Sequence, residues 1–146
     1  MSSVDQGQES VVYGCIKDIA AGDASLRRRI NREAILALPD QEGWPILSRE
    51  MFAVPALEVG AGGQQTQVMH FGASYLGIEY EWTHWMQQFE ELLRKMYWVS
   101  ATVHLETELS GTHSFIWEAS GDYHSPNSDD IQIRCEWTHE GWLSAG

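Results

Sequence analysis

The chain has 146 residues, enough for one domain to bury most of the apolar surface that its unfolded form exposes. Hydrophobic residues make up 43% and charged residues 21%, a composition that excludes intrinsic disorder as the general state. The net charge is −12, and a field of this sign disfavours direct binding to nucleic acid or to an anionic membrane surface.

The negative charge is concentrated in the second part of the chain. Residues 1–50 carry eight acids and six bases, a net charge of −2, whereas residues 51–146 carry thirteen acids and three bases, a net charge of −10. Such a surface attracts cations and basic proteins, although acidity can also serve solubility alone. We therefore expect a basic protein as the partner, with solubility as the alternative interpretation.

The sequence also indicates a compartment. It has no apolar run long enough to span a bilayer, and its start, MSSVDQGQES, lacks the basic and apolar regions of a signal peptide. Cys15 and Cys135 both fall in alternating segments and are expected to be buried, reduced thiols. We expect a cytoplasmic protein.

The first part of the chain predicts one strand and one helix. Residues 1–9 are polar and are expected to form a flexible N-terminus. Val11–Ile19 alternates apolar and polar positions, which predicts a central strand. Asp23 is a suitable N-cap for the helix that follows, and Pro39 ends it. The predicted apolar face of this helix consists of Leu26, Ile30, Ala34 and Leu38.

The middle of the chain predicts two strands and a second helix. Met51–Val59, interrupted by Pro55, and Thr66–Phe71 are the strands, joined by a glycine-rich turn. The second helix follows from the spacing of its large apolar residues by three and four positions. These residues are Trp82, Trp85, Phe89, Leu92 and Met96.

The last third predicts a meander of three strands. Val99–Leu105 alternates strictly, Thr112–Ala119 follows it, and Ile131–Thr138 alternates again after the turn-rich loop Ser120–Asp130. The whole predicts a single α+β domain over residues 10–146, in the order β-α-β-β-α-β-β-β. Its mostly antiparallel sheet would have about six strands, with two helices packed on one face.

The histidines allow one hypothesis of a metal, ligand or catalytic site. His104 and His113 flank a predicted turn and, with Glu106, would lie on the polar face of the sheet. None of the six histidines occurs at the HxxxH or HExxH spacing that places two zinc ligands on one face. Surface histidines account for the same residues, so we expect no metal site, no cofactor and no catalytic residue, and keep this site as the alternative.

Aromatic and acidic residues of the last third predict a protein-binding surface. Exposed tryptophan and tyrosine framed by charged residues are typical of binding hot spots. Trp98 is predicted to share the polar strand face with His104 and Glu106, and Tyr123 lies in the turn-rich loop. The predicted partner-binding residues are Trp98, Glu106, Glu108, Trp117, Glu118, Asp122, Tyr123, Asp129, Asp130 and Trp142.

Three features resemble the immunity proteins of bacterial polymorphic toxin systems, the inhibitors encoded beside Rhs-type and type VI secreted effectors. They are the opening strand VVYGCI, the stretch LPDQEGWPILSREMF (Leu38–Phe52), and the tryptophan-rich second helix followed by acidic strands. The likeness spans roughly residues 10–140 and identifies no subfamily. It implies a stoichiometric, non-catalytic inhibitor that binds the C-terminal domain of a cognate toxin. The number of copies of this chain in the assembly stays open.

Overall fold

The computed structural model describes residues 9–19, 22–43, 46–53, 66–108, 111–128 and, for the backbone alone, 131–138. Within these ranges the strands are β1 (Glu9–Asp18), β2 (Gln67–Leu76), β3 (Ser100–Thr107), β4 (Gly111–Ala119) and β5 (Ile131–Thr138). The helices are α1 (Ala24–Leu36) and α2 (Trp82–Arg94), with short 3₁₀ turns η2 (Gln41–Gly43), η3 (Arg49–Met51) and η4 (Ile78–Glu81).

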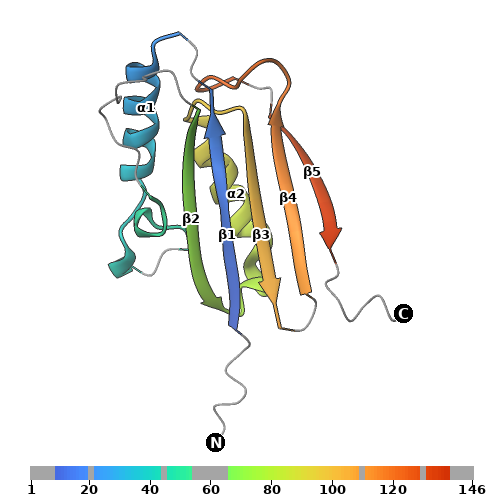
Figure 1. Ribbon diagram of the computed structural model, residues 1–146. Helices are drawn as coiled ribbons and strands as arrows, with labels where there is room; N and C mark the ends of the chain where they lie inside the picture. Colours follow the sequence, from blue (N-terminus) through green and yellow to red (C-terminus); the bar gives the residue numbers. More distant parts are fainter. Residues whose placement is uncertain are drawn as a thin grey trace, which may run out of the picture.

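The strands form one antiparallel sheet in the order β2-β1-β3-β4-β5. In Figure 1, α2 crosses behind the sheet, α1 stands beside β2, and no described helix lies in front of the strands. The α+β class and the antiparallel sheet are confirmed. The predicted central position of the first strand is also confirmed, because β1 pairs with both β2 and β3.

The predicted strand at Met51–Val59 is not formed in the part that the structure describes. Met51 ends the 3₁₀ turn η3, and Phe52 makes a single antiparallel bridge to Phe71. Residues 54–65 lie outside the described residues, as do residues 1–8 of the predicted flexible N-terminus. Glu9, the last residue of that predicted segment, already belongs to β1.

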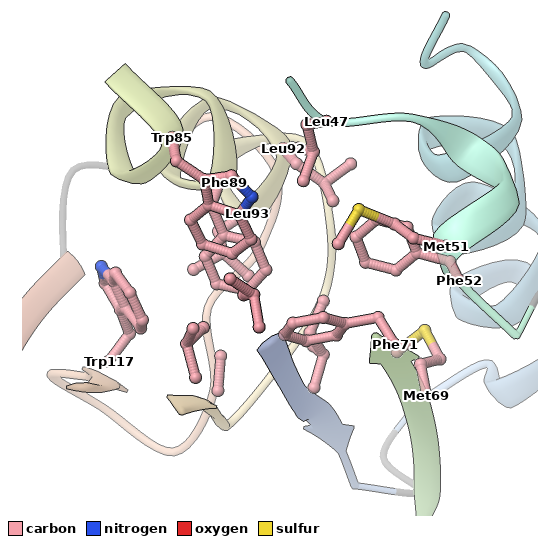
Figure 2. Packing of buried hydrophobic residues seen from close by; sticks show 14 of the residues in the cluster. Leu47, Met51, Phe52, Met69, Phe71, Trp85, Phe89, Leu92, Leu93 and Trp117 are labelled. Atoms are coloured by element: carbon pink, nitrogen blue, oxygen red, sulfur yellow. The ribbon is translucent and has the colours of Figure 1, made fainter. Parts of the chain in front are cut away.

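The core lies between the sheet and α2. Figure 2 shows Trp85, Phe89 and Leu93 of α2 above the sheet, with Phe71 of β2 below them. The Phe71 and Phe89 rings lie 5.3 Å apart between centroids, and Trp85 and Phe89 stack at 5.1 Å. The predicted apolar face of the second helix is therefore confirmed, since its three-and-four spacing brings these large rings onto one side.

The first helix begins where the sequence predicts, and the face that it buries matches the prediction only in part. The Asp23 carboxylate accepts the Leu26 N–H at 3.1 Å, which caps α1. The buried residues are Arg27, Asn31 and Ile35, whereas Leu26 is exposed. Ala34 and Leu38 of the predicted face are half-buried and pack against the core, so the prediction is right in part. It missed Arg27 and Asn31, whose specific polar partners in the interior offset the cost of burying them.

A close approach of three strands explains one glycine in the middle of β1. A Cβ on Gly14 would lie 1.9 Å from the Thr102 carbonyl oxygen of β3 and 3.0 Å from the Phe71 ring of β2. Only a residue without a side chain fits this position. Gly14 thereby allows the sheet to pass close beneath the aromatic core.

Candidate protein-binding face

The sheet has one face turned away from α2, which we call the open face. Side chains alternate along each strand, and the register places the odd-numbered residues of β1 on this face together with the even-numbered residues of β2, β3 and β4. No described helix covers it (Figure 1). Its residues are Val11, Tyr13, Cys15 and Lys17 of β1; Val68, His70, Gly72, Ser74 and Leu76 of β2; Ser100, Thr102, His104 and Glu106 of β3; and Thr112, Ser114, Ile116 and Glu118 of β4.

Four polar side chains form a connected cluster at the centre of the open face. The Tyr13 hydroxyl donates to Glu106 Oε2 at 2.6 Å, and the Tyr13 ring lies 5.0 Å from the His104 ring. His104 Nδ1 in turn makes a hydrogen bond with Ser114 Oγ at 2.8 Å. Tyr13 and His104 are directly opposite each other in the register of β1 and β3, and His104 is opposite Ser114 of β4. The cross-strand pairs thus hold an exposed carboxylate beside an aromatic surface.

The predicted acidic surface is divided between two ends of the sheet. Glu106 and Glu108 are exposed where β3 ends, and Glu118 and Asp122 are exposed where β4 ends. Glu106 is opposite Thr112, so Glu118 lies six residues further along β4, roughly 20 Å away. Asp129, Asp130 and Trp142 lie outside the described residues. Among the described acids, Glu106 is the one that the structure brings into the central cluster.

Two predicted partner-binding tryptophans are buried, so their predicted exposure was wrong. Trp98 is fully buried and lies before β3, which begins at Ser100. Trp98 itself forms an isolated bridge with His124, whose ring stacks on the indole at 5.0 Å. Trp117 is fully buried because the register places it opposite Ala101 on the core face. Its indole N–H donates to the Glu90 carboxylate of α2 at 2.8 Å.

Tyr123 has a position at the surface but also an internal role. It is 37% exposed, and its ring lies 4.2 Å from the guanidinium carbon of Arg27, which also stacks on Tyr97 at 4.5 Å. Arg27 donates to both carboxylate oxygens of Asp18, from Nε at 3.0 Å and from Nη2 at 2.5 Å. Burial alone would lower the pKa of Arg27, but the interactions with Asp18 and Tyr123 together outweigh it and raise the pKa. Tyr123 therefore helps to hold α1 against the sheet.

The alternative site of His104, Glu106 and His113 is not assembled. His104 and Glu106 share the open face, whereas His113 is opposite Leu105 and is buried on the other face. The prediction that all three lie on the polar face was wrong because adjacent positions in paired strands alternate between faces. No group of three potential metal ligands occurs among the described residues. Cys15 is unbridged and half-buried on the open face, rather than buried as predicted.

Sequence reasoning missed three residues of the accessible surface. Tyr13 was grouped with the core strand, yet it carries the Glu106 hydrogen bond. Leu76 and Tyr80 are 68% and 91% exposed at the end of β2 and in η4. Tyr80 falls outside the helical spacing that begins at Trp82, which was the available signal that its ring does not join the core.

No protein-family model, curated protein or solved structure matches the chain in the three comparisons. Within the ranges that the structure describes, no helix is both long enough and apolar enough to cross a membrane.

Proposed function

We propose that this chain is a non-catalytic immunity protein that binds and neutralises a basic, cognate, secreted bacterial toxin domain in the cytoplasm. The observation that carries the proposal is the Glu106 carboxylate, held by the Tyr13 hydroxyl on a sheet face that no described helix covers. The net charge of −12 and the likeness to polymorphic-toxin immunity proteins support the same class.

The cluster suits a lysine or arginine side chain of the partner. One Glu106 oxygen accepts from Tyr13, and the carboxylate retains further acceptor sites for an incoming cation. The Tyr13 and His104 rings lie beside it and offer an aromatic surface on which a guanidinium can stack. The cross-strand contacts already orient these groups before the partner binds. Binding therefore costs less side-chain entropy.

We assign His104 and Ser114 a positioning role in this cluster. Ser114 is buried and its hydroxyl hydrogen-bonds His104, whereas Glu106 is bound to Tyr13. A catalytic serine would have to reach a substrate, and the carboxylate that orients a catalytic histidine would have to contact that histidine. The alternative is a metal- or ligand-binding domain that uses His104 and Glu106. Stoichiometric transition metal in the purified protein, lost on His104→Ala, would favour that alternative.

The proposal is tested with the C-terminal domain of the toxin encoded beside this chain. Glu106→Lys should weaken binding at least about tenfold, because it places a like charge against a basic residue. Glu91 is exposed on the solvent side of α2, and Glu91→Lys changes the net charge by the same amount, so it is the matched control. Tyr13→Phe removes the hydrogen bond and keeps the ring, so a smaller loss is expected. Equal effects of Glu106→Lys and Glu91→Lys would refute the open face as the binding surface.

The peripheral acids are expected to act on the association rate. Asp122 is exposed in the loop after β4, far from the central cluster. Asp122→Lys should slow association at low salt and leave dissociation nearly unchanged, because peripheral charges steer the encounter. Together with Asp129→Lys and Asp130→Lys, it tests the predicted contribution of the turn-rich loop.

A further inference from the structure

The strand β2 lies at an edge of the sheet, and its own sequence lacks the charged residues and proline that protect many edge strands. Its ten residues, QVMHFGASYL, include no charged residue and no proline. Val68 and Leu76 are also exposed on the open face. Natural edge strands are usually shielded by lysine, proline, a bulge or a covering segment, because their free backbone groups pair with other chains. β2 therefore has the character of a strand that receives a partner.

A neighbouring segment covers the first half of this edge. The Ala53 N–H donates to the His70 carbonyl at 2.8 Å, and Phe52 bridges Phe71. The N–H and C=O groups of His70 therefore lie in the plane of the sheet and point away from β1, toward the free edge. Along a strand, successive residues point these groups alternately to one neighbour and to the other. It follows that the N–H and C=O groups of Ser74 and Leu76 also point outward, beyond the covered part. No described residue makes a backbone hydrogen bond to them.

A cavity of about 400 Å³ lies beside this uncovered half of the edge. Ala73, Ser74, Tyr75 and Leu76 line it from β2, and Met51 lines it from the neighbouring 3₁₀ turn η3. The Tyr75 hydroxyl is fixed, since it donates to the Ile46 carbonyl at 2.8 Å and accepts from the Trp85 indole at 3.1 Å. The cavity thus has a preformed wall beside two outward-facing peptide groups.

We infer that an extended segment of a basic protein adds to β2 as a further strand, pairing with Ser74 and Leu76. One apolar side chain of that segment would enter the cavity, because alternate side chains of an added strand point to the same face. Glu9 is exposed, lines the cavity and is opposite Leu76 in the register, so it would attract a neighbouring lysine or arginine. A second copy is disfavoured as the occupant, since each copy carries a charge of −12.

This inference rests on the proposed function only in taking the partner to be a basic protein. It is tested without a toxin, using the full chain and a short peptide of alternating valine and lysine. Peptide binding should slow hydrogen exchange of the Ser74 and Leu76 amides at least about tenfold, because both become donors in a new ladder. The same peptide with alternate N-methylated residues cannot form that ladder and should give no protection.

Two substitutions sharpen the result. Ser74→Pro removes an outward N–H that the described sheet does not use, so it should abolish peptide binding while β1 pairing persists. Glu9→Gln should weaken the valine–lysine peptide several-fold, whereas Glu33→Gln on exposed α1 should not.

Three outcomes would overturn the inference. They are equal protection by the N-methylated peptide, protection that grows with protein concentration and needs no peptide, and absence of protection at millimolar peptide. None of these outcomes affects the Glu106 measurements. The proposal for the β2 edge and the proposal for the open face can therefore be refuted independently.

Discussion

Replacing Arg27 by alanine tests the ion pair that joins the first strand to the first helix. Arg27 and Asp18 are both at least 96% buried, and two hydrogen bonds connect their charged groups. Removing one partner of a buried ion pair leaves the other charge buried and unpaired, which costs about 3–5 kcal/mol of stability. Loss of the ring contacts with Tyr97 and Tyr123 adds roughly 1 kcal/mol. We therefore expect the free energy of unfolding to fall by about 4–6 kcal/mol.

Urea unfolding measured by tryptophan fluorescence provides the assay. With a slope of about 2 kcal/mol per molar urea, the midpoint should fall by about 2–3 M. Arg29→Ala, on the exposed side of the same helix, should change stability by less than about 0.5 kcal/mol and is the matched control. The double variant Arg27→Met with Asp18→Asn leaves no unpaired charge. Its loss of unfolding free energy should be smaller, by at least about 2 kcal/mol, than the sum of the losses of the Arg27→Met and Asp18→Asn single variants.

Two results would refute this reasoning. One is a loss below about 1 kcal/mol for Arg27→Ala, which would mean that solvent reaches Asp18 in the folded protein. The other is strict additivity in the double variant, which would mean that the two residues do not act as a pair.

Three further predictions concern the sheet and the core. Gly14→Ala should destabilise by more than about 3 kcal/mol or prevent folding, whereas Gly121→Ala, with no heavy atom near the added Cβ, should be nearly neutral by thermal unfolding. Burial raises the pKa of Tyr75 above its ordinary value of 10.0, and the Trp85 hydrogen bond opposes this shift only in part. The free energy of unfolding should therefore fall as the pH rises past about 10. In urea titrations, Tyr75→Phe should reduce this loss. Trp117→Phe leaves the Glu90 carboxylate without its indole donor and should cost about 1–3 kcal/mol, measured by urea midpoint.

Strong periodicity predicted the elements whose burial follows from residue type alone. The spacing of Trp85, Phe89 and Leu92 gave the buried face of α2, and the alternation of Ala101, Val103 and Leu105 gave the core face of β3. In these segments the burial of each large apolar side chain is favourable by itself, and the spacing of these side chains fits a single buried face.

The errors arose where burial depends on a distant partner. Arg27 is buried because Asp18, Tyr97 and Tyr123 surround it, and these come from three separate segments. Trp117 follows Phe115 and Ile116, so no period decides its face until the register with β3 is known. Of the residues that we propose to bind the partner, Glu106 was named from its charge, whereas Tyr13 was missed because its contact with Glu106 requires the pairing of β1 with β3.

The central place of β1 has a consequence for how the chain folds. The Tyr13–Glu106 hydrogen bond joins residues separated by 93 positions, and both neighbours of β1 come from much later in the sequence. Because β1 precedes β2 and β3 in the chain, it must wait during synthesis, with Val12 and Ile16 still in water, until both have emerged. Such non-local pairing slows folding, because the entropy of closing the long intervening loops is lost before the strand contacts form. During synthesis β1 is thus an exposed apolar segment that is open to chaperone binding and to misfolding.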